Sequence, residues 1–211
     1  MGCDKALLPW PPSLAALGSG SVTTTSTTST TINTFLSAAI HLFFSHVDVV
    51  LVVVGKNELA LAPIVYTNGA SLVVNPDPDR GQFSSLRVGL QEVLNRGSDK
   101  AMVTLVDRPP VQPETIETLE SAFEQAIINR KWAVIPEYQG KHGHPIVVGR
   151  EMLGAFLKAP ETSTARDVER EYRSEIVYVP VNDPLIAANV NTPEQYASLK
   201  SNLPPQLLPS S

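Results

Sequence analysis

Ala101-Met-Val-Thr-Leu-Val-Asp107 is the stretch that decides the fold of this 211-residue chain. Its first six residues are almost wholly apolar, and a carboxylate follows them directly. An apolar run of this length is typical of a strand that helices cover on both faces. The run Val47–Val54 has the same character. Together the two runs predict an α/β fold in which a mostly parallel sheet lies between two layers of helices, a three-layer sandwich.

Short apolar segments alternate with longer helical patterns along the rest of the chain, as expected for βαβ units. Strands are predicted at 47–54, 71–74, 101–106, 132–136, 145–148 and 175–179. Helices are predicted at 33–45, 84–96, 113–130, 151–157, 165–172 and 193–201. Residues 1–201 are expected to form a single domain, with a flexible Ser/Thr-rich loop at 18–31 and a Pro-rich disordered tail at 202–211.

The composition excludes several classes of protein. The formal net charge of −5 argues against a nucleic-acid binder, which would show a basic stripe. A single cysteine, Cys3, excludes an internal disulfide and a Cys-rich zinc site, and it is typical of a cytoplasmic protein. No apolar run reaches the roughly 18 residues that span a bilayer, so no membrane partner is expected.

Asp107 is the most informative polar residue. A carboxylate that ends an apolar strand is costly to bury unless a cation or a donor meets it, and Mg²⁺ is a common solution. The alternatives are that Asp107 caps the following turn or pairs with Arg108. Ligands of parallel sheets bind beyond the carboxyl ends of the strands. This rule also points to Gly55 and Asn75, which follow two other predicted strands.

The loop from Asn75 to Ser85 leads into a predicted helix. Its free backbone N–H groups and the hydroxyls of Ser84 and Ser85 could hold ribose or phosphate oxygens. The alternative is a plain helix N-cap at Ser84 or Ser85.

A glycine-punctuated turn at 140–145 contains His142 and His144. Alternate residues of an extended chain face opposite sides, so these two side chains are not expected to share a zinc ion. Lys5, near the start, is a possible phosphate donor or simply a solvated lysine.

Five segments resemble motifs of the MobA-like nucleotidyltransferases, especially the molybdenum cofactor cytidylyltransferases, and they follow one another along the chain in the order that the family shows. Val106–Val111 is similar to the family's Gly-Asp-Gln-Pro-Phe-Val, and Gly143-His144-Pro145 to its Gly-His-Pro turn. The other segments are Met1–Trp10, Asn75–Leu90 and Asn191–Glu194. The resemblance implies a Rossmann-like fold of the nucleotide-diphospho-sugar transferase type.

The implied reaction joins a nucleotide monophosphate from CTP or GTP to a phosphorylated acceptor, most simply molybdopterin. By resemblance Asp107 and Asn191 hold Mg²⁺, and Lys5 and Asp107 are the catalytic residues. The nucleotide-binding residues would be Gly2, Lys5, Gly55, Asn75, Ser84 and Ser85. The acceptor-side residues would be Gly143, His144 and Pro145. A monomer or a small homo-oligomer is expected.

The chain also departs from the family pattern. Only the end of the family's N-terminal strand and glycine-rich loop is present, Arg108 replaces a usually uncharged residue, and Asn191 stands where cytidylyltransferases usually have Asp. If residues ahead of Met1 complete the loop in the natural protein, catalysis is expected. One alternative is a non-catalytic binding or chaperone-like homologue that has lost triphosphate binding. Another is a nucleotidyltransferase for a different acceptor, such as a sugar phosphate or phospholactate.

Overall fold

A computed structural model of the chain describes residues 4–12 and 33–199. Gly2, the loop at 18–31 and the tail at 202–211 lie outside these residues. The α-helices are α1 Phe35–Phe44, α2 Glu58–Thr67, α3 Gln82–Asn95, α4 Pro113–Ile128, α5 Arg150–Lys158, α6 Ala165–Glu171 and α7 Pro193–Ser198. The strands are β1 Leu51–Val54, β2 Ser71–Val74, β3 Lys100–Val103, β4 Ala133–Tyr138, β5 Lys141–His142, β6 Ile146–Gly149 and β7 Ile176–Pro180. The short 3-10 turns include η1 Lys5–Leu7, η3 Pro78–Arg80 and η5 Pro184–Ala187.

The described strands form two sheets. β1 and β2 pair in parallel, with Val52 opposite Leu72. The larger sheet has the order β3-β6-β4-β5, and β7 pairs in parallel with β4. β6 runs antiparallel to both β3 and β4. The expected α/β fold is confirmed: β1 and β2 form a parallel pair of their own, and the parallel β4–β7 pair belongs to a sheet whose other pairs are antiparallel.

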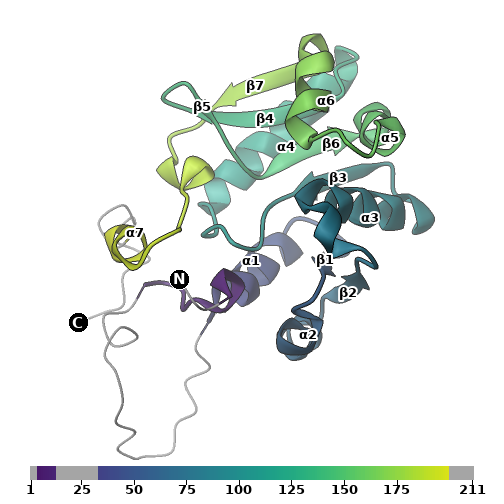
Figure 1. The fold of residues 1–211 in the computed structure, drawn as a ribbon. Coiled ribbons are helices and arrows are strands. Elements are labelled where there is room, and N and C mark those ends of the chain that lie inside the picture. The colour runs from purple at the N-terminus through teal and green to yellow at the C-terminus, as the bar shows by residue number, and fades with distance from the viewer. Residues whose placement is uncertain (1–3, 13–32, 200–211) are drawn as a thin grey trace, which may run out of the picture.

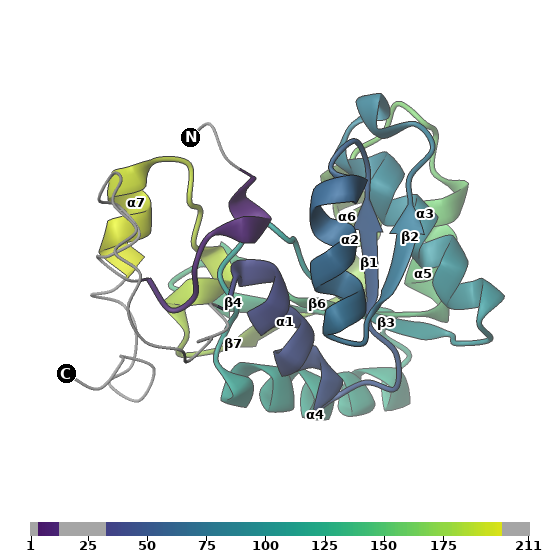
Figure 2. The ribbon, with the colours of Figure 1, turned by 90° about the horizontal axis from the view of Figure 1, so that it is seen from below.

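Helices cover both faces of the larger sheet, because its strands alternate apolar side chains between the two faces. Val134 and Val147 face α4, against Leu119 and Phe123. The opposite face packs against side chains of α3, α5 and α6, among them Phe156. Figure 2 shows α4 beneath this sheet, and Figure 1 shows α5 and α6 on its other side.

The smaller sheet is covered in the same way. Val52 and Val54 of β1 pack with Leu36 of α1 and Leu61 of α2. On its other face α3 lies close to β1, and a Cβ on Gly89 of α3 would come within 2.9 Å of a Val53 methyl carbon. α3 contacts both β1 and β3, so it bridges the two sheets. No helix in the described part of the chain is long and apolar enough to cross a membrane.

Several boundaries differ from the sequence prediction. Helix α2 was not predicted, because it is apolar nearly all round and contains Pro63, which the helical pattern disfavours. β3 ends at Val103, and Asp107 lies beyond it in a turn that Arg108 N closes on Leu105 O at 3.1 Å. β1 begins at Leu51, four residues later than predicted.

The turn η5 docks on the loop that precedes β6. The carbonyl oxygen of Ile186 accepts a hydrogen bond from His144 N at 3.0 Å and another from Arg108 Nη1 at 3.2 Å. A Cβ on Gly143 would lie 2.2 Å from the same carbonyl oxygen. A glycine is therefore needed at position 143, because only a residue without a Cβ lets η5 approach the backbone this closely.

We predict that Gly143→Ala destabilises the protein by about 2 kcal/mol or more, since overpacking a tight contact forces the backbone apart. Gly154→Ala is the matched control: a Cβ there meets nothing within 4 Å, so this helical substitution should be neutral or stabilising by up to about 1 kcal/mol. Urea unfolding of both variants measures the difference. Equal midpoints for Gly143→Ala and the unsubstituted protein would contradict the close contact.

Candidate active site

Three predicted site residues from distant parts of the chain meet at one point. Lys5 Nζ donates a hydrogen bond to Asn191 Oδ1 at 2.8 Å and forms an ion pair with Asp107 Oδ2 at 3.5 Å. The Lys5 and Asp107 side chains are 26% and 46% exposed, so a ligand can reach both. The structure thus brings together the proposed catalytic lysine and both proposed metal ligands.

Local structure fixes the position of Lys5. Asp4 caps η1, since its Oδ1 accepts from Ala6 N at 3.0 Å, and its Oδ2 accepts from Asn57 Nδ2 at 2.6 Å. Ala6 is fully buried in the core beside β1. Because Ala6 points into the core, the neighbouring Lys5 side chain is directed out toward Asp107.

Asn191 is held by the start of α7. Thr192 is the N-cap of a capping box, and Gln195 Oε1 accepts from Asn191 N at 2.7 Å. Tyr196 Oη donates to Pro9 O at 2.7 Å, which joins α7 to the N-terminal segment. Figure 1 and Figure 2 both show α7 beside this segment.

The donor set at this point fits a hard divalent cation. Oxygens of Asp107 and Asn191 already face one positive charge, the Lys5 ammonium. Mg²⁺ is commonly bound by one or two protein oxygens and completed by substrate phosphates and water. No group of three or more His, Cys, Asp or Glu side chains suited to a metal occurs in residues 4–12 and 33–199. Of the interpretations left open for Asp107, pairing with Arg108 is wrong, because its ion-pair partner is Lys5.

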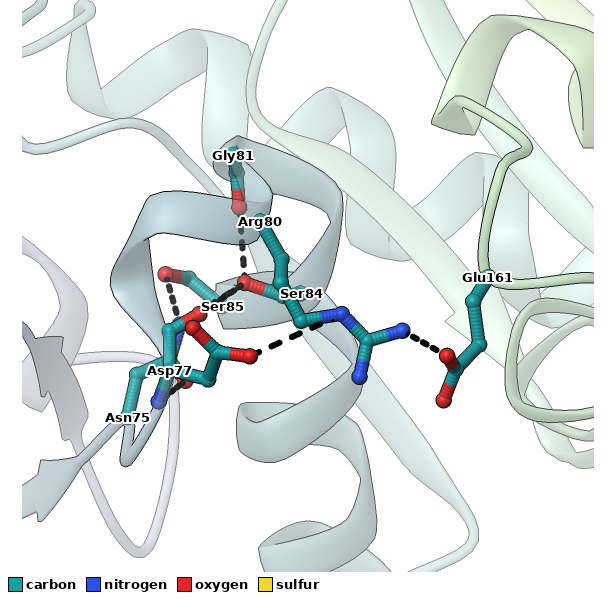
Figure 3. Close-up of polar contacts among 7 residues, drawn as sticks. All are labelled: Asn75, Asp77, Arg80, Gly81, Ser84, Ser85 and Glu161. Carbon is teal, nitrogen blue, oxygen red and sulfur yellow. Dashed lines mark hydrogen bonds and ion pairs between the residues drawn. The ribbon is translucent and has the colours of Figure 1, made fainter.

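Asn75, Ser84 and Ser85 form one hydrogen-bonded group (Figure 3). Asn75 is 3% exposed, and its Nδ2 donates to the hydroxyls of Ser84 and Ser85 at 2.8 and 3.0 Å. Its Oδ1 accepts from Asp77 N at 3.0 Å. The predicted N-cap at Ser84 or Ser85 is wrong: α3 begins at Gln82, and its N-cap is Gly81, whose φ of 87° suits glycine.

Asn75 and Ser84 of this group line a pocket of about 290 Å³ between the start of α3 and the loop after α5. Arg80 also lines this pocket; it pairs with Glu161, and its Nε lies 3.9 Å from Asp77 Oδ2 (Figure 3). Asn75 and Ser84 therefore shape a pocket, while their own polar atoms mostly bond within the protein.

Gly55 connects this pocket to the lysine site by packing. Its N donates to Asn57 Oδ1 at 3.3 Å, and a Cβ on it would lie 2.7 Å from the Cβ of Pro78. The glycine thus lets η3 approach the end of β1. Asn57 also bonds Asp4, so contacts run without a break from Pro78 to the residue before Lys5.

The predicted acceptor-side residues lie beside the end of β3, in the loop that leads into β6. His144 Nδ1 lies 3.4 Å from Val103 O, and Pro145 follows it through a cis peptide bond. Burial, and then the nearby Arg108, lowers the pKa of His144 to about 4, so its ring is neutral at physiological pH. His142 instead stacks on Tyr178, with ring centroids 4.0 Å apart. The two histidines lie apart, as predicted.

Several residues that shape the site were not predicted from sequence. Asp4 could have been found, because an aspartate side chain commonly accepts from the backbone N–H two residues further on. Asp183 could have been found in the same way, since Pro184 follows it and an aspartate before a proline commonly starts a turn. Asp183 is 1% exposed, and its carboxylate accepts from Gln112 N at 2.8 Å and from Leu185 N at 2.9 Å. It ties the start of α4 to η5.

Solved structures with this fold include Rv0371c from Mycobacterium tuberculosis H37Rv, at 21% identity and a TM-score of 0.70 over 94% of this chain and 89% of that one. A complex of Rv0371c with manganese matches at 20% identity and a TM-score of 0.60, over 81% of this chain and 87% of that one. The 4-diphosphocytidyl-2C-methyl-D-erythritol synthase of Anaerococcus prevotii DSM 20548 matches at 13% identity and a TM-score of 0.61, over 81% and 87% of the two chains.

A search of curated proteins found no significant match. A profile of the MobA-like NTP transferase domain matches residues 1–176, which includes Lys5, Asp107 and the Gly143-His144-Pro145 turn. The chain therefore belongs to the family of MobA-like NTP transferase domains and is a nucleotidyltransferase.

Proposed function

We propose that this protein transfers a nucleotide monophosphate from CTP or GTP to a phosphorylated acceptor, molybdopterin in molybdenum cofactor maturation, in a Mg²⁺-dependent reaction. The convergence of Lys5, Asp107 and Asn191 carries the proposal, because an ammonium and two metal-binding oxygens are the groups that a triphosphate needs. The family match supports nucleotidyl transfer. The choice of acceptor is supported by the resemblance of the sequence motifs to those of the molybdenum cofactor cytidylyltransferases.

In the proposed reaction an acceptor phosphate oxygen attacks the α-phosphorus of the nucleotide. The new bond joins that oxygen to the α-phosphorus, the bond from the α-phosphorus to the bridging oxygen breaks, and pyrophosphate leaves. The attacking phosphate is already an anion at neutral pH, so no general base is required. The protein contributes by positioning and by neutralising charge.

Each residue has a distinct part. Asp107 and Asn191 would hold Mg²⁺, which when bound supplies positive charge to the phosphate oxygens. Lys5 donates hydrogen bonds to the oxygens on which negative charge develops. The Asn75, Ser84 and Ser85 group, with the pocket that Asn75 and Ser84 line, would orient the nucleoside. Gly143, His144 and Pro145 would border the acceptor, where neutral His144 offers a hydrogen bond but no charge.

Calorimetric titration of both CTP and GTP into the protein distinguishes between the two nucleotides. A sugar phosphate or phospholactate is the alternative acceptor and can be supplied in the same turnover assay. A cytoplasmic location and a monomeric or small homo-oligomeric state stay predictions from the sequence.

We predict that Asp107→Ala weakens Mg²⁺-dependent binding of CTP or GTP at least tenfold and abolishes turnover, because the metal loses its carboxylate ligand. Isothermal calorimetry of the natural full-length protein, with and without Mg²⁺, measures this. Asp99→Ala is the control, since this exposed aspartate precedes β3 whereas Asp107 follows it.

The same titration decides between the proposed enzyme and its alternative. Binding of neither nucleotide to the unsubstituted protein would sink the transferase proposal and favour a non-catalytic binding homologue. Unchanged binding and turnover in Asp107→Ala would remove Asp107 from the site.

We predict that Lys5→Gln lowers kcat roughly 100-fold, as removal of one donor to a developing anion commonly does. Lys5→Arg should recover part of the loss because it keeps the charge. Steady-state kinetics at saturating Mg²⁺ measure both variants, and exposed Lys158→Gln serves as control. A kcat for Lys5→Gln equal to that of the control would show that Lys5 does not act in catalysis.

We predict that buried His144 makes the free energy of unfolding depend on pH. Its pKa is about 4 in the folded protein against about 6.5 when unfolded, so between these values the unfolded state binds more protons. Stability from this group is complete above about pH 6.5 and decreases as the pH falls toward 4. Urea unfolding between pH 4 and 7 should show a shallower pH slope for His144→Asn. Parallel curves for the two proteins would contradict the buried neutral histidine.

A further inference from the structure

We propose that a second pocket, at the opposite end of the larger sheet from Asp107, binds a small molecule that combines an aromatic ring with an anionic group. Trp132, Arg150, Gly154 and Tyr172 are among the residues that line it. This pocket is separate from the residues of the proposed reaction, so its ligand does not depend on nucleotide transfer.

The register of the larger sheet places this pocket. Lys100, the first residue of β3, lies opposite Gly149, the last residue of β6. Gly149 N donates a hydrogen bond to Trp132 O at 2.8 Å, and Arg150 follows Gly149 as the first residue of α5. Because Asp107 follows the other end of β3, the pocket and the proposed active site lie at opposite ends of that strand.

The size of the pocket suits a small molecule. Its volume is about 380 Å³, and small-molecule sites in proteins measure roughly 300–1,000 Å³. Gly154 of α5 lines it, and a Cβ on this glycine would meet nothing within 4 Å. A glycine inside a helix is less favourable than an alanine, and no close packing contact requires one at position 154. The missing side chain instead leaves space on the pocket wall.

One side of the pocket is aromatic and apolar. The rings of Trp132 and Tyr172 have centroids 5.1 Å apart and planes inclined by 32°. Leu94 and Ala155 extend this surface, and all four side chains pack as partly buried residues at the margin of the core. Aromatic rings favour offset stacking on tryptophan and tyrosine. A planar ring would therefore bury the surface that these residues leave partly exposed.

The other side of the pocket offers a positive charge. Arg150 is exposed, and no carboxylate within residues 4–12 and 33–199 lies at ion-pair distance from it. It stands at the start of α5, where the helix dipole disfavours a cation, so the helix itself does not account for it. A guanidinium binds carboxylate or phosphate through a planar pair of donors. Glu151 also lines the pocket, which directs an anionic group to the Arg150 side.

The test follows the indole N–H signals of the full-length protein by NMR, without nucleotide or Mg²⁺. The chain has two tryptophans, Trp10 and Trp132, and Trp132→Phe assigns their signals. Phenyl phosphate and benzoate are the probes, because they share a ring and differ in the anion. We expect the preferred probe to shift the Trp132 signal with a Kd of about 1 mM, as suits about ten heavy atoms. The Trp10 signal, from a ring packed on Phe35, should not move.

Substitutions on α5 locate the ligand. Gly154→Leu should raise the Kd at least about tenfold, because its side chain fills the pocket. Arg150→Gln should raise it about tenfold, because it removes a charge-assisted donor group. Glu151→Gln is the matched control on the same helix and should keep or lower the Kd. Arg150→Gln changes only an exposed side chain, so it keeps the test valid if Gly154→Leu alters the helix.

Two further probes separate the ring from the charge. Inorganic phosphate lacks the ring and benzyl alcohol lacks the charge, so each should bind at least about tenfold more weakly than the preferred probe. Equally tight binding of either one would contradict the proposed ligand class. A Trp132 signal that neither phenyl phosphate nor benzoate moves, or equal Kd values for Arg150→Gln and Glu151→Gln, would overturn the proposed site.

Discussion

The site depends on one buried carboxylate, that of Asp183. Its oxygens accept hydrogen bonds from Gln112 N and Thr115 Oγ1 at 2.8 and 2.9 Å and from Leu185 N at 2.9 Å. A carboxylate that is 1% exposed requires such donors, because burial without them is costly. These bonds hold the start of α4 and η5 together. The segment that carries Asp107 leads into α4, and η5 leads to Asn191, so this constraint holds together the two segments that carry the proposed metal ligands.

Sequence patterns predicted the regular elements that have clear periodicity or clear ends. Ser71–Val74 matches β2, and α4 begins at Pro113 as its proline and following glutamate indicate. Helix α2 was missed because packing of its buried Leu61 and Val65 on β1 overrides an apolar, proline-containing sequence. The start of α3 was placed too late, since Gly81 takes the N-cap position and the serines bond to Asn75 instead.

For the candidate site, ordered motifs predicted which residues matter but not how they are held. Lys5, Asp107 and Asn191 carry recognisable local patterns, and the structure joins them. Charge in particular is a tertiary property: a chain with a net charge of −5 still brings the Lys5 ammonium to 3.5 Å from Asp107 Oδ2, although the two residues lie far apart in the sequence.

The segment that carries Lys5 also connects the Lys5–Asp107–Asn191 site to the Asn75 pocket. Asp4 caps the turn that presents Lys5 and bonds Asn57, which in turn bonds Gly55, and Gly55 packs on Pro78 at the edge of the Asn75 pocket. The pocket loop is therefore linked to the backbone of η1 through two side-chain hydrogen bonds and one close packing contact. Because buried Ala6 anchors the same turn in the core, η1 is restrained from both sides. The ammonium position is thus fixed by the fold before any phosphate arrives, which is the preorganisation that charge stabilisation needs.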